Sequence, residues 1–102
     1  MIDMKRLEAE FNDDMRRILT EERKVNLHSA RFAQMIEQYG GVEAAHRLLM
    51  PNRELPPNTF GYLRTINRRD LTMEYYVVLE KYSPLFTQEE RDIAKWRLEN
   101  ED

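Results

Sequence analysis

The sequence from residue 3 to residue 24 reads DMKRLEAEFNDDMRRILTEERK, and it decides the fold class. Its apolar residues recur at steps of three, four or one positions, which places them along one stripe of a helix. These residues are Met4, Leu7, Phe11, Met15, Ile18 and Leu19. Charged residues occupy the other faces, and the basic residues Arg23 and Lys24 lie at the C-terminal end, where the helix dipole favours positive charge. The pattern predicts a long amphipathic helix over residues 3–24.

A second helix is predicted over residues 29–39, after a break at residues 25–28. Ser29, or His28 just before it, can accept a hydrogen bond from a backbone N–H at the start of this helix and so cap it. A histidine next to a serine could also suggest a nucleophile with its general base. The capping role explains the two residues more simply. The apolar residues of the segment have helical spacing and are expected to face inward: Phe32, Met35, Ile36 and Tyr39.

The pair Gly40-Gly41 ends the second helix, because glycine suits the left-handed conformation common after a helix C-terminus. A third short helix is predicted over residues 42–50. A double glycine before a helix could also cradle a phosphate. Because no strand precedes it and neither Gly-x-Gly nor Gly-Lys-Ser/Thr follows, the sequence favours a helical hairpin.

The next segment contains three prolines and predicts a loop over residues 51–58: Pro51, Pro56 and Pro57. A short helix is expected to begin at residue 59 or 60 and to end at residue 66, after which residues 67–69 turn the chain. The loop is the longest irregular stretch that the sequence predicts.

Residues 71–79 are ambiguous, because residues 75–79 are typical of a strand. No partner strand is visible elsewhere, and a lone strand is not stable, so a helix is preferred. Asp70 or Thr72 is expected to cap this helix, and Ser83-Pro84 to end it. Its wide apolar surface predicts a central, mostly buried element.

The last helix is predicted over residues 88–99, since Thr87-Gln88-Glu89-Glu90 has the pattern of a capping box. The segments together predict an all-α fold, a compact bundle of five to six short helices with the first helix longest, in a single domain over residues 1–102. The expected core consists of Phe11, Met15, Phe32, Ile36, Leu48, Leu63, Val77, Phe86 and Ile93.

Length and composition agree with one small globular domain. The chain has 102 residues, 41% hydrophobic and 34% charged residues, and a net charge of −3. It has no cysteine, which rules out disulfides, thiolate metal sites and cysteine nucleophiles. No apolar run approaches the roughly 18 residues of a membrane span, and residues 1–6 lack the apolar stretch of a secretory signal. The sequence predicts a small acidic protein, cytoplasmic and without a membrane segment.

Three blocks of sequence occur in an order found in a known family: RFAQMI (31–36) with GGVEAA (40–45) and RLL (47–49); RRDLTME (68–74); and LFTQEE (85–90) with IA (93–94) and RL (97–98). In these blocks the chain resembles a small bacterial helical domain of unknown function, found alone or at the C-terminal end of larger, often hypothetical, proteins. The resemblance covers roughly residues 11–98 and implies an all-helical fold, without implying an activity. Leu27 and Arg69 depart from it, since the family has an aromatic and an apolar residue there.

Catalytic and metal-binding functions find little support in the residues. A partly exposed surface histidine is the simplest interpretation of His46, and two histidines without a His-Glu-x-x-His pattern make a poor metal site. The acidic pairs are interpreted as solvated faces of helices or as part of a cap: Asp13-Asp14, Glu21-Glu22 and Glu89-Glu90. The sequence therefore predicts no enzymatic activity, no metal and no cofactor.

Tyrosine and methionine are also interpreted mainly as packing residues. The tyrosines at positions 39, 62, 75, 76 and 82 could stack on bases or a cofactor, but their helical spacing favours core residues with hydroxyls at the surface. Met4 and Met15 are exceptions of interest, because methionine-rich faces adapt well to partners.

Arginine is the most informative polar residue type. Twelve of the sixteen basic residues are arginine, whose planar fork pairs with carboxylate or phosphate. Between positions 46 and 69 the chain carries five arginines and one acid, a local charge of +4. The candidate binding residues for an anionic partner are Arg47, Arg64, Arg68 and Arg69, with Arg64 and one of the last two expected on one exposed face. In the alternative interpretation, the last two pair with Asp70, Glu74 or acids of residues 3–24.

Three functions remain in competition. The first is a non-enzymatic module that binds another protein or a second copy of itself, as an accessory or regulatory partner. The second is nucleic-acid binding through residues 47–69, although its best recognition helix, residues 60–69, offers few base-contacting side chains. The third is a bacterial or phage defence protein that occludes a partner's surface. The sequence favours the first.

Overall fold

The computed structural model describes residues 3–27, 29–49 and 68–99, and the regular structure in these stretches is helical throughout. The elements are α1 (Met4–Lys24), α2 (Ala30–Tyr39), α3 (Gly41–Leu49), the 3-10 helix η1 (Arg69–Leu71), α5 (Met73–Val77), the 3-10 helix η2 (Glu80–Leu85) and α6 (Gln88–Glu99). The predicted all-α class is confirmed, and α1 is the longest of these helices. The predicted loop at residues 51–58 and the predicted helix after it lie outside the described residues.

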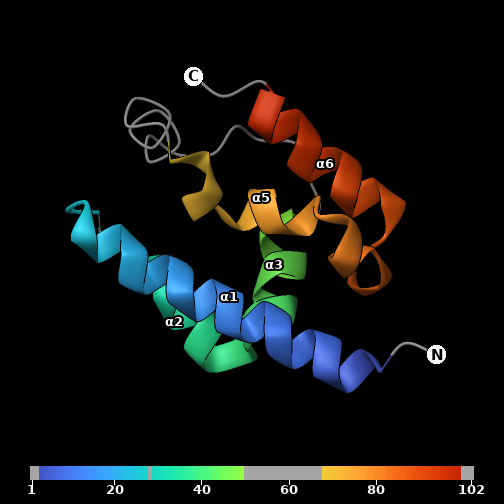
Figure 1. Cartoon of the computed structure of the whole chain (residues 1–102), viewed down its shortest axis with the longest axis horizontal. Coiled ribbons are helices and arrows are strands. Elements are labelled where there is room, and N and C mark those ends of the chain that lie inside the picture. The colour runs from blue at the N-terminus through green and yellow to red at the C-terminus, as the bar shows by residue number, and fades with distance from the viewer. Residues whose placement is uncertain (1–2, 28, 50–67, 100–102) are drawn as a thin grey trace.

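The helices are arranged around α3 and α5, which lie between α1 and α6 (Figure 1). α2 and α3 form a hairpin that packs against α1, and α3 also reaches α6. α5 contacts both α1 and α6, while η2 packs on α1. The prediction of a central and mostly buried element in this part of the chain is therefore confirmed for α5.

The core joins side chains from all five α-helices in the described part of the chain. Its buried members are Phe11, Met15, Ile18, Ile36, Ala44, Ala45, Leu49, Met73, Val77, Tyr82, Leu85, Phe86, Ile93 and Ala94. The ring of Phe11 meets those of Tyr82 and Phe86 edge-on, with centroids 5.0 and 5.1 Å apart. Of the expected core residues, Phe32 and Leu48 are only half-buried at its border, and Leu63 lies outside the described residues.

Most helix ends follow the predicted capping chemistry. Thr72 caps α5 by accepting from the backbone N–H of Tyr75 at 3.1 Å. Gly40 ends α2 with a φ of +84°, a conformation that favours glycine. Ser29 is a correction: it stands at the N-cap position of α2, but its hydroxyl donates to Glu22 at 2.9 Å and makes no capping bond.

The segment after α5 is a second correction. The predicted helix was expected to continue to Ser83-Pro84, but α5 ends at Val77 and the separate helix η2 contains Pro84. The cause is tertiary: extended backbone at Leu79 redirects the chain onto α1, where Tyr82 is completely buried. Burial of that large aromatic side chain outweighs the continuation of one helix.

The capping box at the start of α6 is confirmed. The hydroxyl of Thr87 accepts from the backbone N–H of Glu90 at 3.1 Å, and the carboxylate of Glu90 accepts from the backbone N–H of Thr87 at 2.9 Å. Replacing Thr87 with alanine is expected to lower the free energy of unfolding by about 0.5–2 kcal/mol, because one backbone donor of α6 loses its acceptor. The loss is measured by urea denaturation.

The matched control for this variant is Thr20→Ala. Thr20 is exposed in the C-terminal half of α1 and its hydroxyl donates to the carbonyl of Arg16, so alanine removes no N-terminal cap. Its effect is expected to stay within about 0.5 kcal/mol. Equal urea midpoints for the Thr87→Ala variant and the unmodified protein would show that the capping box contributes nothing to stability.

Candidate functional site

The three acidic pairs are divided between surface and interior. Their interpretation as solvated faces is wrong for Asp14 and Glu22, whereas Glu90 belongs to the predicted cap. Successive helical residues point about 100° apart, so one member of a pair can face solvent while the next faces the core. The second members are buried in every case: Asp14, Glu22 and Glu90. A buried carboxylate needs hydrogen bonds or opposite charge, and these partners identify the polar sites of the molecule.

Asp14 joins α1 to η2 and to an exposed arginine. Its carboxylate accepts a hydrogen bond from the hydroxyl of Tyr82 and forms an ion pair with Arg17, with 2.8 Å between Nη2 and Oδ1. Burial raises the pKa of Tyr82 well above its usual value, and the bond to Asp14 acts in the same direction. Tyr82 is therefore a neutral donor that satisfies a buried carboxylate.

Arg17 extends this network to the surface, where arginine and tyrosine side chains gather. Its guanidinium donates to the hydroxyl of Tyr76 at 3.1 Å and lies 5.9 Å from the centre of that ring. The ring of Tyr75 meets Tyr76 edge-on at 5.3 Å, and Tyr75 is 38% exposed. Asp70 raises the pKa of Arg68, and Tyr76 makes a smaller contribution in the same direction, so Arg68 lies on the same side of the molecule. We call Arg17, Arg68, Tyr75 and Tyr76 the arginine–tyrosine surface; it draws on α1, α5 and the residue before η1.

The predicted arginine patch is only partly described by the structure. Arg47 lies on α3, where it pairs with Glu43 at 3.1 Å and covers the ring of Tyr39 at 4.0 Å. Arg68 binds both carboxylate oxygens of Asp70, at 3.1 and 3.3 Å. These two arginines therefore have acidic partners on separate elements, as in the alternative interpretation for Arg68. Arg64 and the side chain of Arg69 lie outside the described residues, so their role in binding stays a prediction.

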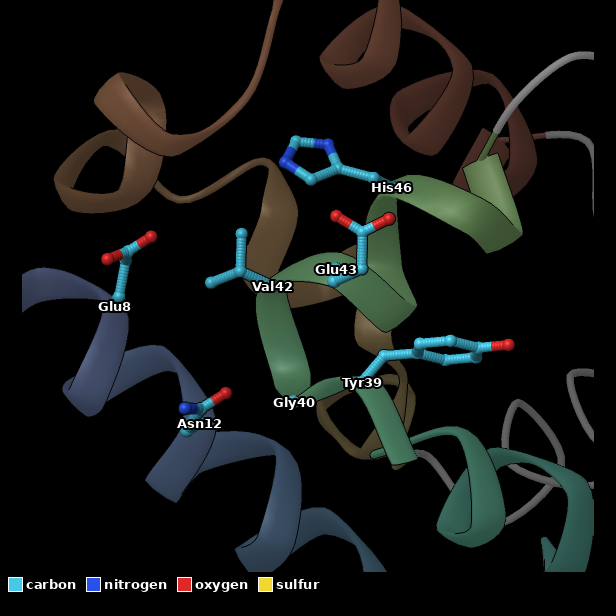
Figure 2. Close-up of a pocket in the computed structure, with 7 residues that line it drawn as sticks. All are labelled: Glu8, Asn12, Tyr39, Gly40, Val42, Glu43 and His46. Atoms are coloured by element: carbon cyan, nitrogen blue, oxygen red, sulfur yellow. The ribbon is translucent and has the colours of Figure 1, made fainter. Parts of the chain in front are cut away.

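Sequence reasoning did not identify the partner of His46. The imidazole is partly exposed, as predicted, but its Nδ1 lies 2.5 Å from the carboxylate of Glu90, and its ring packs 5.2 Å from that of Phe86. His46 also lines a pocket of 310 Å³ between α1 and α3 (Figure 2). No local pattern indicates this contact, since the two residues are 44 positions apart.

Glu22 lies under the turn between α1 and α2, where it accepts the hydroxyl of Ser29. Its other oxygen, Oε1, is buried without a hydrogen-bond partner among the described residues. Burial raises the pKa of Glu22, and the bond from Ser29 opposes the shift only in part. The carboxylate is thus buried with only one of its two oxygens hydrogen-bonded among the described residues, which disfavours its charged form.

Replacing Glu22 with glutamine is expected to stabilise the protein at neutral pH, on the order of 1 kcal/mol, because the variant buries no charge. The folded state holds its proton to a higher pH than the unfolded state, so the contribution of Glu22 to stability is full below about pH 4.5 and is lost as pH rises through the folded pKa. The difference between the variant and the unmodified protein should therefore grow from about pH 4 to pH 8 in urea titrations.

Glu21→Gln is the control for this pH dependence. Glu21 belongs to the same acidic pair but is partly exposed and pairs with Lys24 at 3.3 Å. Its removal is expected to change stability by less than about 0.5 kcal/mol across the same range. If the stability difference between Glu22→Gln and the unmodified protein does not vary with pH, Glu22 is not a buried carboxylate with a raised pKa.

The part of the chain that the structure describes shows neither a metal site nor a membrane-spanning helix. Within it, no three His, Asp or Glu side chains are grouped so that they could hold a metal ion. None of the described helices is long and apolar enough to span a membrane. Of the two methionines of interest, Met4 is exposed and Met15 is fully buried, so Met15 is a core residue rather than part of an adaptable face.

No family model, curated protein or solved structure matches the chain. The resemblance to a bacterial helical domain therefore stays a prediction. Function has to be inferred from the arginine–tyrosine surface and from the pocket beside His46.

Proposed function

We propose that the protein is a non-enzymatic interaction module, an accessory or regulatory partner of another protein in the cytoplasm, and that it contacts this partner through the arginine–tyrosine surface. The observation that carries the proposal is the exposure of Tyr75 within an ordered cluster of arginine and tyrosine. Tyrosine and arginine dominate the energetically important positions of protein interfaces. The absence of cysteine fits a reducing compartment.

The arginine–tyrosine surface is ordered before any partner arrives, which supports a role in binding. Asp14 and Tyr76 both hold the guanidinium of Arg17, and Tyr76 in turn packs against Tyr75. Asp70 holds Arg68 through two hydrogen bonds. Side chains that are already fixed lose less conformational entropy on association, so more of their contact energy appears as affinity.

A protein partner fits these contacts better than a nucleic acid does. Each arginine of the surface already has a carboxylate partner, so a phosphate would have to displace that carboxylate. Arg47 is likewise neutralised by Glu43. A partner protein can instead cover the exposed tyrosine and leave the ion pairs in place. Occlusion of a partner's functional site, as in the defence hypothesis, would be a special case of the same interaction.

The proposal is tested with a photo-crosslinking amino acid placed at position 75 or, as a matched control, at position 39. Tyr39 is a suitable control because it is 37% exposed, almost the same as Tyr75, but belongs to α2 on a different part of the surface. In native extract, crosslinking from position 75 is expected to yield one specific protein adduct, and crosslinking from position 39 none.

Affinity for the purified adduct partner then decides the energetic role of Tyr75. Tyr75→Ala is expected to weaken binding at least tenfold, and Tyr39→Ala less than about twofold. Equal adducts from both positions, or unchanged affinity in Tyr75→Ala, would rule out this surface as the contact. Retention of DNA or RNA that falls steeply with salt, in place of a protein adduct, would favour the nucleic-acid hypothesis.

A further inference from the structure

The pocket between α1 and α3 is lined mainly by polar side chains and by one aliphatic side chain, that of Val42. Its volume is 310 Å³, at the small end for ligand sites. Figure 2 shows the carboxylate of Glu8 and the ring of His46 converging above Val42, while the ring of Tyr39 points away. Glu8 is exposed and forms no ion pair among the described residues, so its charge is available to a ligand.

The orientation of the His46 ring is fixed by Glu90, which does not line the pocket. The Glu90 carboxylate is buried and lies 2.5 Å from Nδ1 of the imidazole, so Nδ1 carries the proton and donates it to that carboxylate. Glu90 is itself fixed by the capping box with Thr87. In the neutral imidazole Nε2 is then an acceptor, and it lies at the free end of the ring, toward Glu8 (Figure 2).

The remaining polar groups of the pocket are already engaged. The Glu43 carboxylate accepts from Arg47, whose guanidinium lies over the ring of Tyr39. The side-chain oxygen of Asn12 accepts the backbone N–H of Gly41. Of the carboxylates that line the pocket, that of Glu8 forms no ion pair among the described residues, and it lies on the side toward which Nε2 of His46 points, with Val42 between them.

We propose that this pocket binds a primary ammonium group between the carboxylate of Glu8 and Nε2 of His46. An ammonium carries three donors, a positive charge and no acceptor, which complements two acceptors of which one is anionic. The methylene groups next to the nitrogen would lie on Val42. The pocket's size suits a short alkylamine or a single lysine side chain. This site is separate from the arginine–tyrosine surface and does not depend on the function proposed for it.

The test is an NMR titration of the ¹⁵N-labelled protein at about pH 8. The probes are n-butylammonium and, as a cation of similar size without N–H donors, tetramethylammonium. We expect n-butylammonium to shift the resonances of His46 and Val42 saturably, with a millimolar Kd, and tetramethylammonium to produce no saturable shift. Nα-acetyl-lysine amide forms the second arm: tighter binding than n-butylammonium indicates a lysine side chain as the natural ligand, and equal binding indicates a free amine.

Three variants connect the response to the pocket. Glu8→Gln and His46→Gln are each expected to weaken n-butylammonium binding about fivefold or more, whereas Glu10→Gln, which changes a neighbouring carboxylate of α1 that lies near Lys81, changes it less than about twofold. Glu8 is exposed, so its replacement leaves the fold intact and the test decisive. Equal shifts with both cations, a non-saturating response, or unchanged binding in Glu8→Gln would overturn the proposal.

Discussion

Replacing Arg97 with methionine is expected to lower the free energy of unfolding by about 3–5 kcal/mol, the largest effect among the changes considered. The Arg97 guanidinium donates to the carboxylate of Glu74 at 3.0 Å and to the carbonyl of Leu48 at 2.9 Å, so it ties α6 to both α5 and α3. Its side chain is 8% exposed and that of Glu74 only 7%. Methionine fills much of the space but leaves the carboxylate buried without its cation.

The loss in Arg97→Met should depend on pH. Burial already raises the pKa of Glu74, and the guanidinium opposes that shift, so its removal lets the folded state hold the proton more tightly. The variant is then least destabilised in acid and loses stability as pH rises through the folded pKa. Urea denaturation at about pH 5 and pH 8 measures the difference.

A double variant separates the buried charge from the lost contacts. Glu74→Leu combined with Arg97→Met replaces the ion pair with apolar side chains of similar volume, and such replacements are often neutral or stabilising. We expect the double variant to regain most of the stability that Arg97→Met loses. If both variants are equally unstable, the contribution of Arg97 lies in its bond to Leu48 and not in the pairing of charge.

Replacing Gly41 with alanine is the second large change, with an expected loss of about 1–3 kcal/mol. A Cβ at this first residue of α3 would lie 2.6 Å from Oδ1 of Asn12, 3.1 Å from its Cα and 3.1 Å from Cγ of Met15. The Asn12 oxygen is also the acceptor for the Gly41 backbone N–H, so moving it away breaks that bond. Alanine normally favours a helix over glycine, so helix propensity alone would make the variant more stable. A loss of stability would therefore indicate the close contact with Asn12.

Ala30→Gly is the matched control, because Ala30 is the first residue of α2 and is exposed. It measures the difference between alanine and glycine at a helix start without the close contact, about 1 kcal/mol or less. The pair Asn12→Ala and Gly41→Ala should be less destabilising together than the sum of the two, since the closest contact is gone. A Gly41→Ala variant as stable as the unmodified protein in urea would show that α1 and α3 are not in close contact there.

Local chemistry accounts for what could be predicted from the sequence. The apolar stripe of residues 3–24 corresponds to α1, and the capping box begins α6 at the expected residue. Gly40 separates α2 from α3 as expected, although α3 begins at Gly41, one residue earlier than predicted. These features depend on groups within a few positions of one another, namely side-chain spacing, a cap and the conformational freedom of glycine.

The interior polar contacts could not be predicted, because their members are far apart in the chain. The hydroxyl of Tyr82 is 68 positions from Asp14, and Nδ1 of His46 is 44 positions from Glu90. An acidic pair on a helix has the same appearance in sequence whether the second residue faces water or a donor from another helix. The candidate surface was likewise anticipated only at Arg68, since Arg17 reaches Tyr76 across 59 positions.

The helical class, the span of the long first helix and the start of α6 follow from the sequence alone, because spacing and capping act over one or two turns. The start of α5 was narrowed only to two possible caps, Asp70 and Thr72. Only the tertiary structure decided which carboxylates are buried, where α5 gives way to η2, and which tyrosines remain exposed. Those outcomes depend on the burial of Tyr82 against α1 and on cations or hydroxyls supplied by distant helices. Burial and charge pairing are properties of the assembled helices, so they have no signature in any short stretch of the chain.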